Sequence, residues 1–324
     1  MSLPKVYITR PLPAKAVERL AARYDVKMRP EDAPLDPAQL AESCRDIEGL
    51  IATGVRVSED VVAQAPRLRA VANVGVGYDN IDVAACTRRG IPVTNTPDVL
   101  TETTADLAFA LLMAAPRRLV ECDRYVREGQ WQSSKWELLW GSDIHGKTLG
   151  VYGLGRIGKA VVRRARGFSM RVIYHDVVRP TPALEEELGA QFVDRETLLR
   201  EADFLTLHVP LTPETHHLVG ARELSMLKPT AFLINAARGK CVDEAALVEA
   251  LQSKRLAGAG LDVFEHEPHV HPELLRLPNV VLAPHVGSAT AQTRLAMAML
   301  AVENLVAGLE GRRPPNLVNP EIYA

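Results

Sequence analysis

Three glycines at G-x-G-x-x-G spacing, Gly153, Gly155 and Gly158, constrain the fold of this 324-residue chain more than any other feature. They stand in TLGVYGLGRIGKAVVRRARGF, after a β-rich run and before a segment with helical spacing. In that context the first glycine allows a tight turn, the second lets a phosphate approach the backbone, and the third lets helix and strand pack closely. An ordinary Gly-rich turn is the alternative. The full pattern predicts a dinucleotide site in a βαβ unit.

An acidic residue follows these glycines at the distance expected of a ribose ligand. Asp176 comes 18 residues after Gly158, at the end of the β-rich run RVIYHD. A carboxylate there can accept both ribose hydroxyls of the adenosine, and it repels a 2′-phosphate. The position therefore favours NAD(H), although Arg179, three residues on, could offset part of the repulsion and leaves NADP(H) open. A solvated acid at a strand end is the alternative for Asp176.

Short β-rich runs alternate with helical segments, which predicts an α/β fold with parallel sheets. A first series of runs covers residues 5–10, 26–29, 48–53, 69–74 and 91–94. A second series, which makes the six strands of a dinucleotide-binding sheet, covers residues 148–152, 171–174, 204–208, 231–235, 257–262 and 280–283. Helices are expected at residues 101–115 and after Ser288.

The composition excludes several classes of protein. Lys and Arg total 38 against 40 Asp and Glu, and the basic residues are scattered, so no nucleic-acid partner is expected. The longest apolar stretch, residues 107–116, is far shorter than the ~18 residues of a membrane span, so no membrane partner is expected. The start of the chain has no apolar signal region, which predicts a cytoplasmic protein. No spacing of Cys and His indicates a metal site.

Three charged or ionisable residues each follow a β-rich run. They are Arg238 in INAARGKCVDE, Glu267 in GLDVFEHEP and His285 in LAPHVGSAT. Ligands of open α/β sheets bind at the carboxyl ends of the strands. Hydride transfer to a 2-oxo acid needs a cation for the acid, a proton donor and a group that tunes the donor, and these residues supply all three. Each residue also has a structural interpretation when it is considered alone: Arg238 as a surface charge, Glu267 as a loop acid and His285 as a buried histidine.

The chain resembles the D-isomer-specific 2-hydroxyacid dehydrogenases nearly from end to end. The resemblance rests on the glycine pattern, on the three segments above, and on GVGYDNID at 75–82, TPDVLTETTADLAFALL at 96–112 and HVPLTPETHHLVG at 208–220. Within that family the motifs are most similar to those of glyoxylate/hydroxypyruvate reductases. The resemblance implies NAD(P)H-dependent reduction of a small 2-oxo acid, glyoxylate or hydroxypyruvate, to the D-2-hydroxy acid, and the reverse reaction.

The resemblance also implies a domain organisation. We expect two Rossmann-like domains, in which a doubly wound parallel-sheet nucleotide domain is inserted in a smaller flavodoxin-like substrate domain. Residues 1–99 and 289–324 would form the substrate-binding domain, and residues 100–288 the NAD-binding domain. The active site is expected in the cleft between the two domains.

The resemblance implies a role for each matching residue. Arg238 would bind the substrate's carboxylate and carbonyl oxygen, His285 would exchange the proton, and Glu267 would pair with His285 and hold its ring. Val76 and Gly77 would offer backbone amides to the substrate carboxylate. The cofactor groove would be lined by Thr104, Gly153, Gly155, Arg156, Ile157, Gly158, Asp176, His208, Pro210, Thr215, Ala236, Arg238, Asp262, His285 and Ser288. For His208 a structural role is the alternative.

Trp131, Trp136 and Trp140 lie within ten residues of one another. Such a group is typical of an interface or of an anchor in the core. In the resembling reductases this segment belongs to a dimerisation loop that brings an aromatic side chain to the neighbouring subunit's active site. We therefore expect a homodimer, with Trp136 or Trp140 near the substrate.

Other functions within the same fold stay open. A 2-ketogluconate reductase, a phosphoglycerate dehydrogenase or a phosphite dehydrogenase would share the layout, although the phosphite enzyme carries a lysine where this chain has Val76. A candidate of another class is an NAD-sensing protein similar to transcriptional corepressors, which can keep the Arg, Glu and His. The absence of a polar or low-complexity tail counts against it.

Overall fold

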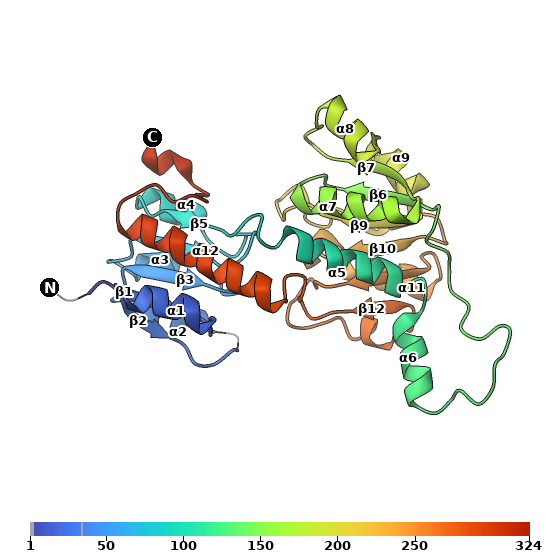
Figure 1. The fold of residues 1–324 in the computed structure, drawn as a ribbon, viewed down its shortest axis with the longest axis horizontal. Coiled ribbons are helices and arrows are strands. Elements are labelled where there is room, and N and C mark those ends of the chain that lie inside the picture. The colour runs from blue at the N-terminus through green and yellow to red at the C-terminus, as the bar shows by residue number, and fades with distance from the viewer. Residues whose placement is uncertain (1–2, 34) are drawn as a thin grey trace. The chain divides into compact units, whose positions relative to one another are not determined.

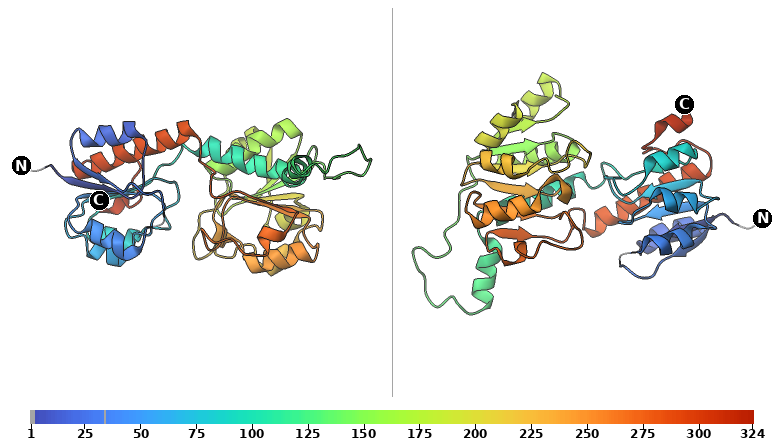
Figure 2. Two further views of the ribbon diagram at one scale, coloured as in Figure 1. Left: turned by 90° about the horizontal axis from the view of Figure 1, so that it is seen from below. Right: turned by 180° about the vertical axis from the view of Figure 1, so that it is seen from behind.

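The computed structural model describes residues 3–33 and 35–324 and divides the chain into two compact units. Unit 1 contains the chain up to Leu100 and from Ser288 on, and unit 2 contains Thr101–Gly287. Each unit is a parallel sheet between two layers of helices (Figures 1 and 2). The predicted fold, with two Rossmann-like domains, is confirmed. The substrate and nucleotide roles of the two units stay predictions.

Unit 1 has a sheet of five parallel strands in the order β2-β1-β3-β4-β5, the order of flavodoxin-like folds. Every residue of β3 and β4 is buried, as expected for strands covered on both faces. The strands are β1 (Lys5–Ile8), β2 (Asp25–Met28), β3 (Gly49–Ala52), β4 (Ala70–Asn73) and β5 (Val93–Thr94).

Two sets of helices cover the sheet of unit 1 (Figure 2). One face carries α1 (Ala14–Ala21) and the long helix α12 (Ala291–Leu309), which returns from the end of unit 2. The other face carries α2 (Pro37–Cys44), α3 (Glu59–Ala63) and α4 (Val83–Arg88), and a short 3-10 helix at Pro320–Tyr323 follows. The Thr290 hydroxyl caps α12 by accepting the N–H of Thr293, which explains why the helix begins there.

Unit 2 has a sheet of seven parallel strands in the order β12-β11-β10-β9-β6-β7-β8. The strand order reverses between β6 and β9, which is the switch point where nucleotides bind in such sheets. Strand β8 was not predicted, because it has three residues of which only Ala190 is buried. The strands are β6 (Thr148–Tyr152), β7 (Arg171–His175), β8 (Ala190–Phe192), β9 (Phe204–Leu207), β10 (Phe232–Asn235), β11 (Gly258–Leu261) and β12 (Val280–Leu282).

Helices also cover both faces of the second sheet (Figures 1 and 2). Helices α5 (Thr101–Ala114) and α7 (Arg156–Ala165) pack together on one face. The other face carries α9 (Arg195–Glu201), α10 (Ala221–Met226) and α11 (Glu244–Gln252), and α8 (Pro182–Leu188) lies beyond β7. Short 3-10 helices occur at Arg166–Phe168, Gly239–Cys241 and Leu274–Arg276. None of the described helices is long and apolar enough to cross a membrane.

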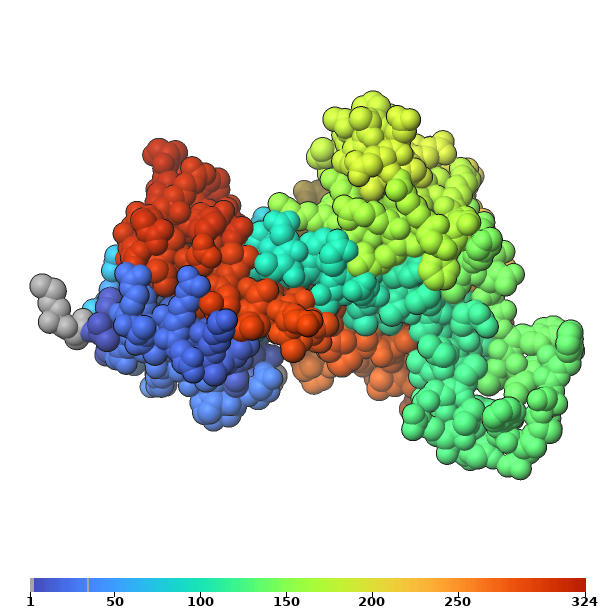
Figure 3. All heavy atoms as spheres, viewed as in Figure 1, coloured from blue at the N-terminus to red at the C-terminus, as the bar shows by residue number. Residues whose placement is uncertain are grey.

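Helix α6 (Leu119–Arg127) and the segment after it project from the rest of unit 2 (Figures 1 and 3). No residue of α6 is buried, and Trp131, Trp136 and Trp140 are all exposed, Trp136 to 90%. The tryptophans are therefore not anchors of this chain's own core, and that interpretation was wrong. Their role at an interface stays a prediction.

Candidate active site

The local backbone requires a glycine at two of the three positions of the G-x-G-x-x-G pattern. Gly153 follows β6 and has a φ of +93°, and a Cβ there would lie 2.8 Å from the carbonyl oxygen of His208. A Cβ on Gly158 would lie 2.2 Å from the carbonyl oxygen of Gly153. Any larger residue at these two positions would strain the turn or push α7 away from the sheet.

Gly155 has no such structural requirement. Its φ is −70°, which any residue can adopt. Apart from its chain neighbours, a Cβ there would meet no atom of the described residues within 4 Å. The residue caps the N-terminus of α7, where the backbone amides of the first turn and the helix dipole favour an anion. The open space at Gly155 therefore fits the pyrophosphate of a dinucleotide.

Asp176 lies beside this turn. Its Oδ2 accepts the N–H of Leu154 at 2.6 Å, and its Oδ1 accepts the N–H of Val178 at 3.2 Å. The carboxylate is thus fixed between the glycine turn and the loop after β7. Each oxygen has a second lone pair, so the group is still able to accept ribose hydroxyls.

His285 and Glu267 form a hydrogen-bonded pair. Nδ1 of His285 lies 2.7 Å from Oε2 of Glu267, and Oε1 of Glu267 accepts the N–H of Phe264 at 3.0 Å. The His285 side chain is half exposed, and its φ of +54° places it in the left-handed region. Because Nδ1 is engaged, Nε2 is the ring nitrogen that remains for proton exchange.

The pKa of Glu267 is lowered by its neighbours. Burial raises the pKa of this carboxyl, but the hydrogen bond and charge of His285 lower it, as do the Phe264 amide and the charge of Arg238, and the net pKa lies below the usual value. The carboxylate is therefore ionised at neutral pH and stabilises a positive charge on the imidazole.

Asp262 holds the loop that carries His285. Its Oδ1 accepts the N–H of Val286 at 2.7 Å and its Oδ2 accepts the N–H of Gly287 at 2.8 Å. The backbone oxygen of Asp262 accepts the N–H of His285 at 2.8 Å. Burial raises the pKa of Asp262, although both amides oppose this. The resemblance implied a place for Asp262 in the cofactor groove, and its role in fixing the histidine loop was not predicted.

Arg238 follows β10 in a turn held by Asn235. The Asn235 amide donates to the carbonyl of Arg238 at 2.9 Å and accepts the N–H of Ala237 at 3.0 Å. A Cβ on Gly239 would lie 1.9 Å from the Phe264 carbonyl, so this turn lies directly against the loop that leads to Glu267. The structure thus brings Arg238, Glu267 and His285 together after β10, β11 and β12. Asn235 and Gly239 were not predicted from the sequence, although a glycine next to an arginine at a strand end was a visible signal.

His208 follows β9 and carries a buried nitrogen without a partner. Its Nε2 lies 2.9 Å from the Thr206 hydroxyl, and its Nδ1 has no hydrogen bond within the described structure, although part of the residue is exposed. Burial lowers the pKa of His208 to about 4, so the ring is neutral at pH 7. An unpartnered nitrogen next to the glycine turn also fits a polar ligand at this edge of the sheet.

The other predicted cofactor residues lie around the same edge. Thr215 donates from its hydroxyl to the Pro210 carbonyl at 2.6 Å, which closes the turn after β9. Thr104 is buried on α5, and a Cβ on Gly287 would lie 3.3 Å from its methyl group. The remaining members are Ala236 after β10, Arg156 and Ile157 at the start of α7, and Ser288 at the start of the return to unit 1.

The predicted substrate residues outside these loops are Val76, Gly77, Trp136 and Trp140. Val76 and Gly77 follow β4 in unit 1, where Asn95 donates to the carbonyl of Val76 at 2.7 Å and Asn73 to that of Gly77 at 2.6 Å. The two tryptophans lie on the projecting segment after α6, and not in the loops after β10, β11 and β12. Their contacts with substrate stay predictions.

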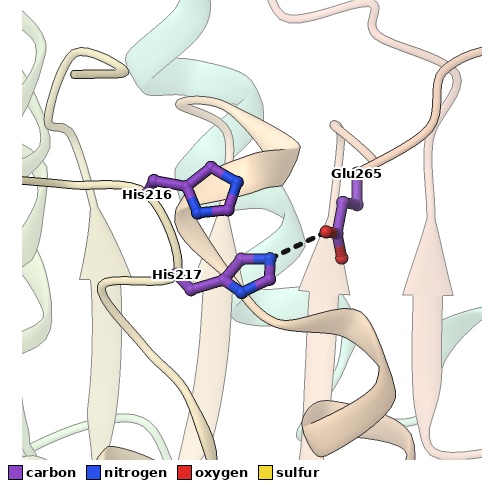
Figure 4. Close-up of side chains that lie close together, drawn as sticks. All are labelled: His216, His217 and Glu265. Atoms are coloured by element: carbon purple, nitrogen blue, oxygen red, sulfur yellow. Dashed lines mark hydrogen bonds and ion pairs between the residues drawn. The ribbon is translucent and has the colours of Figure 1, made fainter. Parts of the chain in front are cut away.

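One group of side chains among the described residues has the ligand types of a metal site. His216 and His217, after β9, and Glu265, after β11, place ligand atoms within 4.8 Å of one another (Figure 4). Nε2 of His217 lies 2.7 Å from Oε1 of Glu265, and the two histidine rings stack at 4.1 Å. This hydrogen bond and the stacking of the two rings account for the closeness of the group without an ion. The sequence had not indicated the group because Glu265 comes from a different loop than the two histidines.

The doubly wound sheet of unit 2, with its glycine turn and acid at the switch point, defines a Rossmann-fold nucleotide-binding protein. Residues 109–287 match the family model of the D-isomer specific 2-hydroxyacid dehydrogenase, NAD binding domain. The chain belongs to this family, and it is an oxidoreductase, as predicted.

Individual relatives match over the whole chain. The chain is 51% identical to a glyoxylate reductase of Thermococcus gammatolerans, with 98% of this chain and 97% of the relative covered. It is 49% identical to that of Pyrococcus furiosus, with 98% and 96% covered. The structure of an NADPH-dependent glyoxylate/hydroxypyruvate reductase from Sinorhizobium meliloti, in complex with NADP and malonate, superposes with a TM-score of 0.88 at 39% identity, with 98% and 97% covered. The predicted similarity to glyoxylate and hydroxypyruvate reductases is confirmed.

Proposed function

We propose that this enzyme reduces glyoxylate or hydroxypyruvate to the corresponding D-2-hydroxy acid with NADH, and catalyses the reverse oxidation with NAD⁺. The observation that carries the proposal is the 2.7 Å pair of His285 and Glu267 in loops next to Arg238. A proton donor held by a carboxylate and next to a guanidinium suits the reduction of a carbonyl that lies beside a carboxylate.

The chemistry follows from these three side chains. Arg238 binds the substrate's carboxylate and carbonyl oxygen with its planar guanidinium. When bound, the nicotinamide supplies the hydride that forms the new C–H bond at the carbonyl carbon. His285 gives the proton from Nε2 to the carbonyl oxygen, while Glu267 holds Nδ1 and stabilises the imidazolium. In the oxidation, His285 takes the hydroxyl proton instead.

The loops of unit 2 would hold the nucleotide. The turn from Gly153 to Gly158, with Arg156 and Ile157, would bind the pyrophosphate, and Asp176 would bind the adenosine ribose and favour NADH. The groove would be completed by Thr104, His208, Pro210, Thr215, Ala236, Asp262 and Ser288. NADP(H) is the alternative cofactor, because the Sinorhizobium relative is NADPH-dependent.

The substrate-binding role falls to the remaining predicted residues. Residues 1–99 and 289–324 would form the substrate domain, with the amides of Val76 and Gly77 on the substrate carboxylate. The enzyme would act as a homodimer in the cytoplasm, with Trp136 or Trp140 of the projecting segment near the neighbouring subunit's substrate. The exposure of these tryptophans and of Leu119, Val120 and Val126 supports a partner surface there.

Initial rates with NADH and NADPH, each against glyoxylate, hydroxypyruvate, pyruvate and 2-ketogluconate, test the proposal. Fast NADH oxidation with either of the first two acids is expected. A faster rate with 2-ketogluconate or pyruvate would overturn the proposed choice of substrate. A preference for NADPH would overturn the proposed choice of cofactor. Absence of turnover in every pairing, with NADH bound, would overturn the proposed reduction.

A further inference from the structure

The first basic residue after Asp176 in the chain is already paired. Arg179 is the only basic residue between Asp176 and Glu185. Its Nε donates to Oε1 of Glu185 at 2.8 Å and its Nη2 to Oε2 at 2.9 Å, which makes a bidentate ion pair. Its guanidinium also lies over the ring of Phe192, 5.0 Å from the centroid. Both contacts fix the position of the Arg179 side chain.

Glu185 is itself held in place. It lies in the first turn of α8, and its side chain is only 13% exposed. It also accepts a hydrogen bond from the hydroxyl of Tyr174, a residue of β7. The hydrogen bonds from Arg179 and Tyr174 lower the pKa of Glu185 to about 2, so the carboxylate is charged at neutral pH. The acceptor of the Arg179 side chain is therefore a charged group oriented by two neighbours.

A 2′-phosphate on the adenosine needs a cation, and Arg179 is the candidate that this loop offers. To bind the phosphate, the Arg179 side chain would have to leave Glu185 and Phe192. Val177 and Val178, which are 96% and 74% exposed, have no charge to offer. NADPH would thus meet two carboxylates, Asp176 and Glu185, and an arginine whose charge is already compensated.

We propose that Glu185 is a positioning residue for cofactor specificity, which favours NADH because it holds Arg179 away from the 2′-position of the adenosine. This inference rests on the proposed role of Asp176 at the ribose. It implies that Asp176 is not the sole determinant, and that replacing Asp176 alone relaxes the preference only in part.

The experiment measures the dissociation constants of NADH and NADPH by titration calorimetry on the full chain. The variants are Glu185→Gln, Arg179→Ala and the double variant, with Glu187→Gln as the matched control, since Glu187 is an exposed acid on the same helix. In Glu185→Gln we expect Kd for NADPH to fall about fivefold, the factor that corresponds to one exposed ion pair. Kd for NADH should stay within about twofold, since this cofactor has no 2′-phosphate.

The double variant identifies the arginine as the cause. We expect the gain in NADPH affinity to disappear when Arg179→Ala is added to Glu185→Gln, and to shrink as salt is raised. If Glu185 had only a structural role, its replacement would change Kd for NADH and Kd for NADPH by similar factors. In the wild-type background, Arg179→Ala should leave Kd for NADPH unchanged, which tests the inference even if Glu185→Gln folds poorly.

Two outcomes would overturn the inference. One is an NADPH affinity in folded Glu185→Gln equal to that of the wild type. The other is a loss of NADPH affinity in Arg179→Ala, which would mean that Arg179 already serves the phosphate. The wild-type ratio of the two Kd values separately tests the cofactor proposal, so failure of the inference and failure of the proposed function are distinguishable.

Discussion

Nδ1 of His285 lies 2.7 Å from Oε2 of Glu267, and the other oxygen of that carboxylate accepts the Phe264 amide. Each oxygen of the Glu267 carboxylate therefore has one partner, and the Phe264 amide helps to hold the carboxylate against the imidazole. The histidine is fixed as well, since Asp262 binds the two amides that follow it. The proposed proton exchange at Nε2 would thus occur from a ring whose orientation is set by the protein before substrate arrives.

Replacing Glu267 with Gln should lower kcat for reduction about 10- to 100-fold, because the amide can no longer stabilise the imidazolium by charge. Kd for NADH should stay within about twofold, since Glu267 is not among the proposed nucleotide ligands. Steady-state rates and a fluorescence titration check both values. Glu273→Gln is the control, because Glu273 is a partly exposed acid that pairs with Arg276 and not with a histidine. An unchanged kcat would show that the pair is not used in catalysis.

His285→Ala and Arg238→Ala should each abolish reduction, with a loss of at least about 100-fold in kcat/KM. NADH binding should stay nearly intact, because all the other residues of the proposed cofactor groove are retained. The first removes the proton donor and the second removes the group that holds the substrate. Rates and binding are measured on the same preparations. Loss of NADH binding in both variants would refute these two roles.

The glycines of the turn should respond differently to alanine. Gly155→Ala should keep the melting temperature of the wild type, because a Cβ there meets no protein atom within 4 Å, but it should weaken NADH binding. Gly158→Ala should lower stability by about 1–3 kcal/mol, because its Cβ would lie 2.2 Å from the Gly153 carbonyl. Thermal unfolding and NADH titration separate the two effects. Normal NADH affinity in Gly155→Ala would argue against a pyrophosphate at that point.

His208 should make stability depend on pH. The pKa of a histidine in the unfolded chain is about 6.5, and burial lowers that of His208 to about 4 in the fold. Between these values the unfolded state binds more protons, so the contribution is complete above pH ~6.5 and is lost as pH falls toward ~4. This contribution of His208 to the free energy of unfolding amounts to about 3 kcal/mol.

The measurement for His208 compares urea unfolding of the wild type and His208→Gln at several pH values, without cofactor. The glutamine variant should lose less stability than the wild type as pH falls from ~6.5 to ~4. His145→Gln is the control, because His145 is exposed. Parallel pH curves for the wild type and His208→Gln would contradict the assignment.

The projecting segment should carry the contact between two copies of the chain. Trp136→Asp and Val126→Asp alter side chains that are 90% and 54% exposed, so the fold of the single chain should be unaffected. Sedimentation should show a dimer for the wild type and a shift to monomer for these variants. A wild-type monomer, or variants that remain dimeric, would exclude this segment as the interface.

The sequence alone was sufficient for the features that depend on local pattern. The alternation of β-rich and helical segments predicted both sheets, and the glycine spacing with Asp176 predicted the nucleotide edge. It missed β8, because three residues with one buried side chain give no periodic signal. The proposed catalytic residues were predicted largely from the resemblance to a known family. The structure brings these residues, Arg238, Glu267 and His285, to neighbouring loops.

Only the tertiary structure decided which contacts those residues make. Gly153, Gly155 and Gly158 are equal in the sequence, yet close backbone neighbours restrict the first and third and leave the second open. Arg179 stands three residues after Asp176 in the sequence, and only the fold shows that its side chain contacts Glu185 and Phe192. The physical reason is that spacing along the chain sets local conformation, whereas charge pairing, burial and steric room depend on residues that come together only when the strands assemble.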